Sequence, residues 1–395
     1  MSDLATLKQR AIVAIDTRRE QLLQISQTIF DNPELAFEEF KASALLCDML
    51  EANGFEVERG IGGLETAFRA EAHGASNGAT IAILAEYDAL PNLGHACGHN
   101  LIAAAAVGAG LAVRACISEL AGRIVVIGTP AEESGGGKII LLERGVFADV
   151  DAALMTHPSS RTTAARTSLA SLGLQLEFRG KAAHAAAAPQ DGINALEAVI
   201  QTFVGVNALR LHLRNDARVH GIITHGGTAP NIIPEYAAAA FSIRAATLDD
   251  ANTVAARVIE CARGGATATG AQLTHRITKS LAHVIPNRVI ANLLEDNWCA
   301  LGVAVDDPGT REQMGSTDMG NVTHALPAVH AYIAIAPPGV AGHSIEFRDA
   351  AISERGQVAM LNAAKGMALT ALDLLSNTEL LRAAKIEFQK ETQKR

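Results

Sequence analysis

The sequence Thr80-Ile81-Ala82-Ile83-Leu84-Ala85-Glu86 is a continuous apolar run that ends in a carboxylate. Such a run is typical of a β-strand that is covered on both faces. A helical pattern from about Leu101 to Glu119 follows it, and the next apolar run, Arg123 to Gly128, is interpreted as a second strand. Strands that alternate with helices in this way indicate a mostly parallel sheet flanked by helices.

The same alternation continues on both sides of this segment. Residues 1–30 and 39–53 precede it and show the three-to-four spacing of apolar residues that is typical of helices. The elements predicted after it are a helix near Lys138, a short strand at 152–155, a strand at 331–335 and a helix at 353–375. We therefore predict an α/β fold for most of the chain.

The middle of the chain has a different pattern. Ser171 to Arg179 and Ala237 to Ala245 alternate apolar and polar residues, which suggests half-exposed antiparallel strands. Helical patterns at 195–213 and 249–263 lie between and after these strands. This segment is therefore predicted to be an α+β domain inserted into the α/β fold.

The length supports two domains, because 395 residues exceed the size at which one hydrophobic core usually stops growing. We predict that residues 1–168 and 282–395 form the catalytic α/β domain. The inserted α+β domain is predicted at residues 169–281.

The composition excludes several classes of protein. Hydrophobic residues make up 49% and charged residues 19%, so the chain has no signature of disorder. The net charge is −9 and no basic patch stands out, which argues against nucleic acid as a partner.

Residues 101–113 form the longest apolar stretch, which is too short and alanine-rich to span a membrane. The five cysteines are odd in number and widely spaced, so a disulfide framework is not expected and a reducing compartment is the simpler interpretation. Residues 1–20 lack a signal-peptide pattern. We therefore expect a cytoplasmic protein.

Candidate metal ligands follow the predicted parallel strands. The first strand is followed by His95, Cys97 and His99, the second by Glu132 and Glu133, and the third by His157. Loops at the carboxyl ends of parallel strands line the ligand crevice of an open sheet. Imidazole, thiolate and carboxylate groups together suit zinc, or manganese where carboxylate and water dominate. These segments are therefore predicted to meet at one metal site.

Cys97 and His99 are separated by one glycine. In an extended loop, alternate residues point the same way, so one ion can take both side chains. The pair is equally compatible with a small buried cysteine and a loop histidine that is satisfied by other groups.

Glu132 and Glu133 are adjacent, so their carboxylates cannot both point at one ion. One can bind metal while the other faces the attacking water as a general base. The alternative is a solvated acidic loop before a helix, but the three glycines at 135–137 favour a close approach of backbone to a ligand. Asp88 could orient a ligand histidine, or it could cap a turn before Pro91.

Several motifs together resemble one protein family. They are Asn32-Pro33-Glu34-Leu35-Ala36-Phe37-Glu38-Glu39, Glu86-Tyr87-Asp88-Ala89-Leu90-Pro91, His95-Ala96-Cys97-Gly98-His99-Asn100, Pro130-Ala131-Glu132-Glu133, Gly180-Lys181-Ala182-Ala183-His184-Ala185-Ala186, Asn231-Ile232-Ile233-Pro234 and Arg244. The chain resembles metallopeptidase family twenty, which contains aminoacylases, glutamate carboxypeptidases and indole-acetyl-amino-acid hydrolases. The resemblance covers nearly the whole chain and implies a zinc-exopeptidase-like catalytic domain with an inserted dimerisation or lid domain.

The resemblance also implies roles for individual residues. Two divalent ions, zinc or manganese, would be held by Cys97, His99, Glu133, His157 and His343. Glu132 would be the general acid and base, with Asp88 behind the ligands. On the inserted domain, His184 would polarise the scissile carbonyl, often in the partner subunit, while Asn231 and Arg244 would bind a substrate carboxylate or support the oxyanion. His95 is interpreted as structural.

Two departures from the plant-type hydrolases indicate a branch of the family. Asn100 replaces the aspartate that usually follows Gly-His, and the segment Gly315 to Val322 also differs. Both resemble the branch that contains a subunit of aminobenzoyl-glutamate hydrolase and dipeptidases that act on β-alanyl or basic dipeptides. Because asparagine cannot bridge two metals as a carboxylate does, one metal site is expected to be weaker.

The function predicted from these residues is a metal-dependent amidohydrolase that cleaves a dipeptide or an N-acyl amino acid. Its partners would be a small amide substrate and a second copy of the chain, without nucleic acid or membrane. An aminobenzoyl-glutamate-type hydrolase is the alternative, and a non-catalytic binding protein on the same scaffold is a remote one. Every matched position is occupied, which favours an enzyme.

Overall fold

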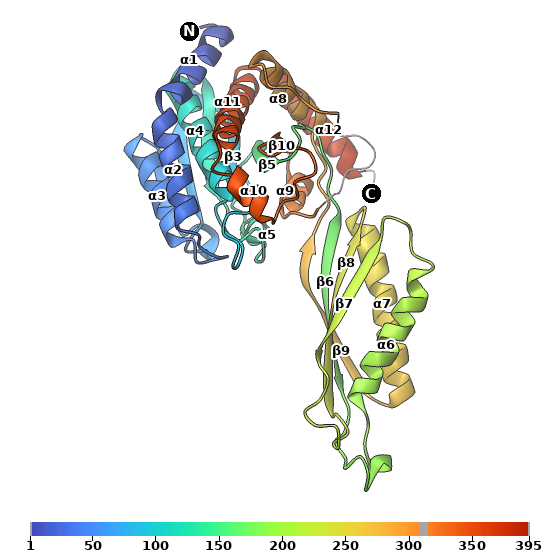
Figure 1. Ribbon diagram of the computed structural model, residues 1–395. Helices are drawn as coiled ribbons and strands as arrows, with labels where there is room; N and C mark the ends of the chain where they lie inside the picture. Colours follow the sequence, from blue (N-terminus) through green and yellow to red (C-terminus); the bar gives the residue numbers. More distant parts are fainter. Residues whose placement is uncertain (1, 308–314, 394–395) are drawn as a thin grey trace. The chain divides into compact units, whose positions relative to one another are not determined.

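The structure is a computed structural model that describes residues 2–307 and 315–393 (Figure 1). The chain divides into two compact units. The first comprises Met1–Thr167, Val284–Gln313 and Asn321–Arg395, and the second comprises Ser168–His283 and Met314–Gly320. The second unit thus includes the segment 315–320, which the sequence-based division assigned to the catalytic domain.

A six-stranded sheet forms the centre of the first unit, with the strand order β1-β2-β4-β3-β5-β10. The strands β4, β3, β5 and β10 are parallel, whereas β1 and β2 pair antiparallel at one edge. The bounds are β1 Glu56–Arg59, β2 Phe68–His73, β3 Ser76–Ala85, β4 Ala121–Gly128, β5 Ala152–Ser159 and β10 Ala328–Ala334. The predicted fold class, a mostly parallel sheet flanked by helices, is confirmed.

Helices cover the sheet, and α4 and α11 pack against both the strands and each other. The bounds are α1 Leu4–Thr17, α2 Arg19–Asp31, α3 Phe40–Ala52, α4 His99–Ile117, α5 Gly137–Glu143, α8 Arg288–Ala300, α9 Met319–Ala325, α10 Ile345–Ala350, α11 Glu354–Ser376 and α12 Thr378–Gln393, with a 3₁₀ turn η1 at Ile61–Gly63. In Figure 1, α1, α2 and α3 lie on the side of α4 away from α8.

The single helix predicted for residues 1–30 is wrong, because the chain breaks at Arg18 into α1 and α2. Arg18 has φ −99° and ψ 11°, and its N–H bonds back to the carbonyls of Ile15 and Asp16. The buried residues continue at helical spacing across the break, at Leu7, Ala11, Ile15, Leu22, Ile25 and Ile29. The apolar pattern therefore does not reveal the break.

The helix α4 packs closely because its core face is built from alanine and glycine. A Cβ at Gly108 would lie 2.9 Å from Leu22 Cδ1, and one at Gly110 would lie 2.5 Å from Val126 Cγ2. By length and composition, both α4 and α11 could cross a membrane, so the expectation that residues 101–113 are too short underestimated the helix. Most of each apolar window, 89% in α4 and 83% in α11, is buried inside the protein, which makes both helices weak evidence for a membrane span.

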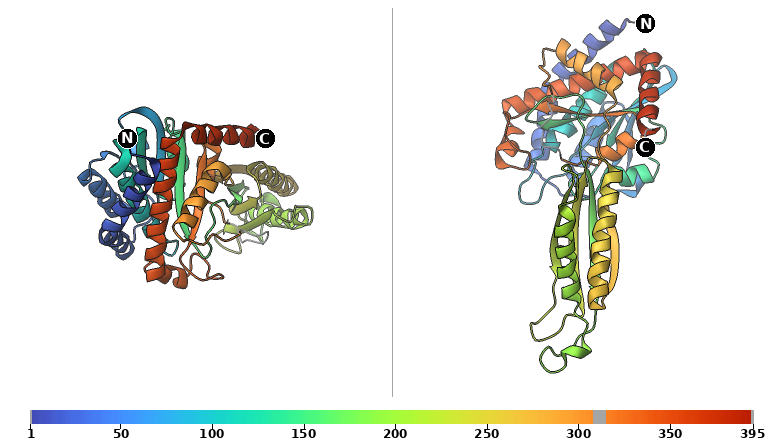
Figure 2. Two further views of the ribbon diagram at one scale, coloured as in Figure 1. Left: turned by 90° about the horizontal axis from the view of Figure 1, so that it is seen from above. Right: turned by 90° about the vertical axis from the view of Figure 1, so that its right-hand side faces the viewer.

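The second unit contains a four-stranded antiparallel sheet of order β7-β8-β6-β9. Its elements are β6 Ala170–Arg179, η2 Pro189–Asp191, α6 Ala195–Arg210, β7 Arg218–His225, β8 Tyr236–Ala245, α7 Leu248–Thr269 and β9 Gln272–Leu281. Figure 2 shows α6 and α7 side by side along this sheet. Leu172, Leu174, Leu176 and Phe178 alternate along β6 and are buried in the same core as residues of α6 and α7, as the sequence pattern predicts.

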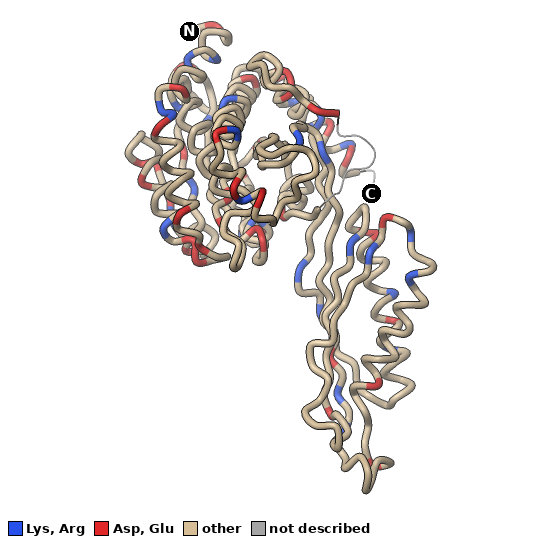
Figure 3. Tube along the Cα trace, in the orientation of Figure 1, with Lys and Arg blue, Asp and Glu red and all other residues tan. Residues whose placement is uncertain are grey.

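Four strands were not predicted: β1, β2, β7 and β9. Three of them are largely exposed, so they show neither a continuous apolar run nor a regular alternation. The five cysteines are free thiols. Acidic and basic residues are interspersed over the helices of the first unit (Figure 3).

Candidate metal centre

Three strand ends and one later loop bring the candidate ligands together. Cys97 precedes α4, His99 is its first residue, Glu133 lies in the loop after β4, and His343 lies in the loop before α10. His157 was predicted to follow the third strand, but this is wrong, because β5 extends to Ser159 and contains it. The strand is longer than predicted because Tyr332 of β10 pairs with His157.

Gly98 allows the close approach of two of these segments. It has φ +79°, in the left-handed region that favours glycine, and it caps the start of α4. A Cβ at this position would lie 2.8 Å from Pro158 Cγ. The glycine therefore lets the loop that carries Cys97 and His99 lie directly against the end of β5 with His157.

The five candidate ligands form two groups of donor atoms that share one thiol. The Cys97, His99 and His157 donors all lie within 4.8 Å of one another, and so do those of Cys97, Glu133 and His343. Cys97 Sγ lies 3.5 Å from His157 Nε2, and Glu133 Oε1 lies 3.4 Å from His343 Nε2. The structure thus brings together all the residues that the sequence proposed as metal ligands.

These separations fit ligands of common metal ions. Two ligands at about 2.0–2.3 Å from one tetrahedral ion lie about 3.3–3.7 Å apart. The observed distances of 3.5 Å and 3.4 Å fall in this range. In addition, His99 Nε2 and Glu133 Oε1 are buried without a hydrogen-bond partner among the described residues. Buried polar atoms of this kind point to a bound ion, so the residues present fit a divalent metal.

Asp88 fixes the orientation of His99. Asp88 Oδ1 lies 3.0 Å from His99 Nδ1, and the Asp88 carbonyl lies 2.9 Å from the same nitrogen. The Nδ1–H therefore donates to Asp88, which leaves the Nε2 lone pair for a cation. The other carboxylate oxygen, Oδ2, accepts from the Glu133 N–H at 3.0 Å. Burial opposes ionisation of Asp88, but His99 and this N–H outweigh it and hold the pKa of Asp88 below its usual range.

A carbonyl acceptor similarly orients His157, and hydrogen bonds fix the loop of His343. His157 Nδ1 lies 2.7 Å from the carbonyl of Pro158, so its Nε2 also faces the donor group. Burial lowers the pKa of His157 to about 3, which keeps the imidazole neutral and able to bind metal. His343 has φ +61°, and its backbone N–H bonds to the carbonyl of Ala96 at 2.9 Å.

Glu132 lies next to the donors without belonging to either group. Its carboxylate lies within 4.8 Å of the donor atoms of His99 and Glu133. The preceding residue, Ala131, has φ +61°, a strained conformation for a residue other than glycine. The buried carboxylate of Glu39 holds this backbone, since its Oε1 accepts from the Ala131 N–H at 2.8 Å. This loop therefore places a carboxylate beside the candidate ions.

Sequence reasoning missed three charged residues beneath this centre. Glu39 closes the first quoted motif, but nothing in the motif indicates that it supports the loop of Glu132. Glu86 and Lys138 are fully buried, and Lys138 Nζ donates to Glu86 Oε1 at 2.5 Å. Glu86 ends an apolar strand and opens one of the quoted motifs, but neither feature indicates its bond to Lys138, which stands in no quoted motif.

Among the described residues, the side chains of His95 and Asn100 form no hydrogen bond with a candidate metal ligand. His95 is buried, and its ring lies 6.3 Å from that of Phe30. The Asn100 amide donates to Ser26 Oγ at 2.9 Å and to the Ala351 carbonyl at 3.5 Å. Asn100 therefore ties α4 to neighbouring helices.

The candidate substrate residues of the second unit lie in two separate places. His184 and Asn231 are neighbours, because the N–H of Ala185 donates to the Asn231 carbonyl at 3.0 Å. Arg244 lies near the other end of β8, eight residues beyond Tyr236 in the strand, a span of about 26 Å at the usual rise. Its Nη1 lies 3.4 Å from Ser316 Oγ. The structure therefore brings His184 and Asn231 together, but not with Arg244 of the same chain.

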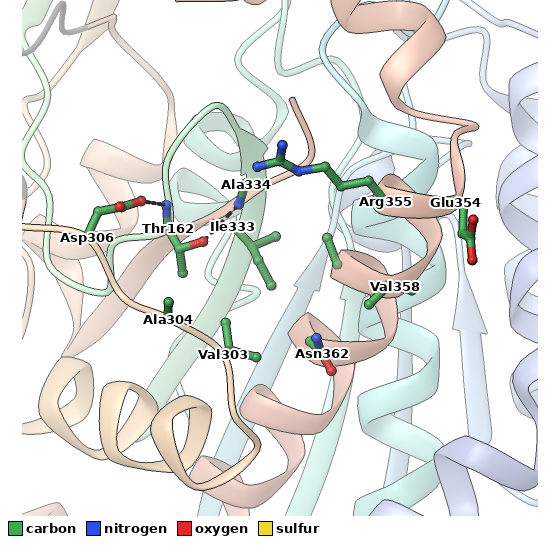
Figure 4. A pocket seen from close by; sticks show the side chains of 11 residues that line it. Thr162, Val303, Ala304, Asp306, Ile333, Ala334, Glu354, Arg355, Val358 and Asn362 are labelled. Atoms are coloured by element: carbon green, nitrogen blue, oxygen red, sulfur yellow. Dashed lines mark hydrogen bonds between the residues drawn. The ribbon is translucent and has the colours of Figure 1, made fainter. Parts of the chain in front are cut away.

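A separate cavity in the first unit is lined by none of the candidate site residues. It has a volume of about 580 Å³ and is shown in Figure 4. Asp306 Oδ2 accepts from the Thr162 N–H at 2.8 Å, and Thr162 Oγ1 accepts from the Ala334 N–H at 3.1 Å. Asp306, Thr162 and Ala334 thus bond to one another, and the polar side chains of Glu354, Arg355 and Asn362 also line the cavity.

Comparison with known proteins extends these findings. Residues 168–267 match the M20 peptidase dimerisation domain. The chain is 38% identical to the Xaa-Arg dipeptidase of Mus musculus, over 98% of this chain and 93% of the relative. It is 36% identical to a subunit of p-aminobenzoyl-glutamate hydrolase from Escherichia coli, over 71% of this chain and 62% of the relative.

A solved structure shares the fold. The YXEP protein of Bacillus subtilis, described as a dinuclear metal-binding peptidase from the M20 family, superposes with a TM-score of 0.69 at 22% identity. The match covers 91% of this chain and 99% of that protein.

Proposed function

We propose that this chain, which belongs to the M20 family of peptidases and is a hydrolase, is a dipeptidase that uses two divalent ions. The observation that carries the proposal is the pair of donor groups that share Cys97, each with one ligand pair at 3.4 Å or 3.5 Å. The similarity to Xaa-Arg dipeptidase over 98% of the chain favours a dipeptide with a basic C-terminal residue. A thiolate shared by both groups favours zinc over manganese.

The protein residues would divide the work of hydrolysis. Bound ions would supply Lewis acidity and lower the pKa of the attacking water toward neutrality. Glu132, adjacent to the ligand Glu133 but outside both donor groups, would take a proton from this water as it attacks the carbonyl. It would then deliver the proton to the leaving amine. Asp88 would hold His99 and the Glu133 backbone in place through bonds to both.

We propose further that the active form is a homodimer in which His184 acts on a substrate bound by the partner. The match to a dimerisation domain supports this. Within the described residues, β7 pairs along one edge only, and it exposes Ile222 and Ile223 by 65% and 45%. An open, apolar strand edge is a ready surface for a second sheet. His184 lies at one end of this sheet. Ala170 and Leu281, the first residue of β6 and the last residue of β9, lie at the opposite end.

A second candidate function has one observation in its favour. The 36% identity to a subunit of p-aminobenzoyl-glutamate hydrolase covers 71% of this chain. Arg244 of the second unit could bind the carboxylate of either kind of substrate bidentately. Substrate assays therefore need both classes.

The test is a hydrolysis screen with metal-free protein reloaded with zinc or manganese. It compares Xaa-Arg and Xaa-Lys dipeptides, β-alanyl dipeptides, N-acyl amino acids and aminobenzoyl-glutamate. We expect the highest kcat/KM on basic dipeptides, and a loss of about 10²- to 10⁴-fold in Glu132→Gln with unchanged metal content. Failure of fully metal-loaded protein to hydrolyse any of these amides would refute the proposal.

Mixed dimers test the role of His184. Glu132→Gln and His184→Ala homodimers should each be inactive for different reasons. A mixed dimer has one site with both groups intact if His184 acts across subunits, so mixing should restore activity. Activity that stays at the level of the two separate variants means that His184 does not act in trans.

A further inference from the structure

The geometry points to Glu86 as an additional oxygen ligand of the ion held by His99, with Lys138 fixing its carboxylate. The inference rests on the proposed function, because it assumes that His99 binds a metal ion. Glu86 ends the apolar strand quoted first, and its side chain is fully buried. Sequence reasoning assigned it no role.

The position of Glu86 relative to His99 carries the inference. Glu86 Oε2 lies 3.4 Å from His99 Nε2, the nitrogen that Asp88 leaves free for a cation. Ligands at about 2.1 Å from one tetrahedral ion lie about 3.4 Å apart. The distance therefore equals that expected for two ligands of a single ion. It also equals the 3.4 Å between Glu133 and His343, which were predicted as ligands on other grounds.

Lys138 explains how this carboxylate is held. Its ammonium group donates to Glu86 Oε1 at 2.5 Å, and both side chains have no exposed surface. With Oε1 bonded to Lys138, Oε2 is the oxygen that faces His99. Carboxylate ligands in metal sites are commonly fixed by a hydrogen bond to their second oxygen. The Glu86–Lys138 pair has this arrangement.

The loop after β4 is shaped to deliver Lys138. A Cβ at Gly137 would lie 1.9 Å from the Pro130 carbonyl, so only glycine permits this turn. Lys138 follows as the second residue of α5. The same loop thus carries Glu132, Glu133 and the lysine that holds Glu86.

The experiment compares metal binding by wild type, Glu86→Gln, Lys138→Met and the double variant Glu86→Gln/Lys138→Met. Each metal-free protein is titrated with zinc against a chromophoric chelator, and the Co(II)-loaded form is examined by visible absorption. We expect wild type to bind two ions. Glu86→Gln should bind one of them about 10- to 100-fold more weakly, with a changed Co(II) spectrum.

The other variants separate a ligand from a structural ion pair. Lys138→Met leaves the buried Glu86 carboxylate facing the ion, so metal should raise its Tm by more than it raises that of wild type. The double variant removes both charges at similar volume, and it should fold and show the same weak site as Glu86→Gln. If Glu86→Gln alone does not fold, the metal affinity of the double variant tests whether Glu86 is a ligand.

The outcomes distinguish the two proposals. Two ions bound with wild-type affinity and an unchanged Co(II) spectrum in Glu86→Gln, or in the folded double variant, would overturn the role of Glu86 alone. If wild type itself binds no zinc, the proposed function fails as well. A Tm increase on metal addition that is equal in Lys138→Met and wild type would also contradict the inference.

Discussion

The substitution Asp88→Asn tests whether the hydrogen bonds behind the metal ligands control metal affinity. Asp88 uses both carboxylate oxygens, one for His99 Nδ1–H at 3.0 Å and one for the Glu133 N–H at 3.0 Å. Asparagine has the same shape but only one acceptor oxygen. Either the His99 bond or the Glu133 bond is therefore replaced by two donors that face each other.

The size of the effect follows from what remains. The Asp88 carbonyl still lies 2.9 Å from His99 Nδ1, so the variant keeps the tautomer that presents Nε2 to the ion. It loses the charge that raises the basicity of His99 and one anchor of the Glu133 loop. Losses of this kind typically weaken metal binding about 10- to 100-fold, which is about 1.4–2.8 kcal/mol.

The assay is competition for zinc between the protein and a chromophoric chelator, together with Tm measurements of the metal-free forms. Asp373→Asn is the matched control. Asp373 is also a buried carboxylate with two donors, Lys8 Nζ at 2.8 Å and Asn297 Nδ2 at 2.9 Å. This control should lower the Tm and leave zinc affinity unchanged. Wild-type zinc affinity in Asp88→Asn would refute the reasoning.

Three further changes test other parts of the centre. Cys97→Ser should remove both ions without unfolding the chain, because the thiol belongs to both donor groups. Metal analysis of the control Cys116→Ser, whose thiol is buried elsewhere, should show two ions. One tightly held ion in Cys97→Ser would contradict the shared ligand. Gly137→Ala should lower both Tm and activity, since its Cβ would meet the Pro130 carbonyl at 1.9 Å, whereas Gly264→Ala has open space and should be neutral or stabilising by up to about 1 kcal/mol. Burial raises the pKa of Glu39 from 4.5 to about 7 in the folded chain, so the proton-linked stabilisation is complete below pH 4.5 and is lost as the pH rises through 7. Denaturation of the metal-free protein should therefore show that the free energy of unfolding of wild type falls by on the order of 3 kcal/mol relative to that of Glu39→Gln over this pH interval. If the difference in unfolding free energy between the two proteins does not change with pH, the shifted pKa of Glu39 is disproved.

The sequence was sufficient to predict the convergence of the ligand loops, for a topological reason. The carboxyl ends of parallel strands meet at one edge of a sheet, so residues that follow β3 and β4 must lie near the end of β5. The prediction therefore needed only the strands and not their exact ends. Even the misplaced end of β5 left His157 at this edge.

The features that the sequence did not reveal depend on side-chain direction and on exposure. Neither the position of Glu86 nor that of Lys138 indicates that one donates to the other, since this contact depends on the turn at Gly137. The strands β7 and β9 are exposed along most of their length, so no apolar pattern marks them. The separation of His184 from Arg244 follows from strand register, which the alternation of residues does not fix.

Asn100 stands where the plant-type hydrolases have an aspartate, and the expectation of a weaker metal site assumed that residue 100 faces the metals. In the structure, its amide donates to Ser26 and to the Ala351 carbonyl, which belong to the helical packing around α4. The carboxylate oxygens near His99 include those of Asp88 at 3.0 Å, Glu86 at 3.4 Å and Glu133 at 3.9 Å. If Glu86 completes the shell of the ion on His99, then asparagine at position 100 carries no cost in metal affinity. Asn100→Asp should accordingly leave zinc affinity unchanged, and tighter binding in that variant would show that residue 100 reaches the ions.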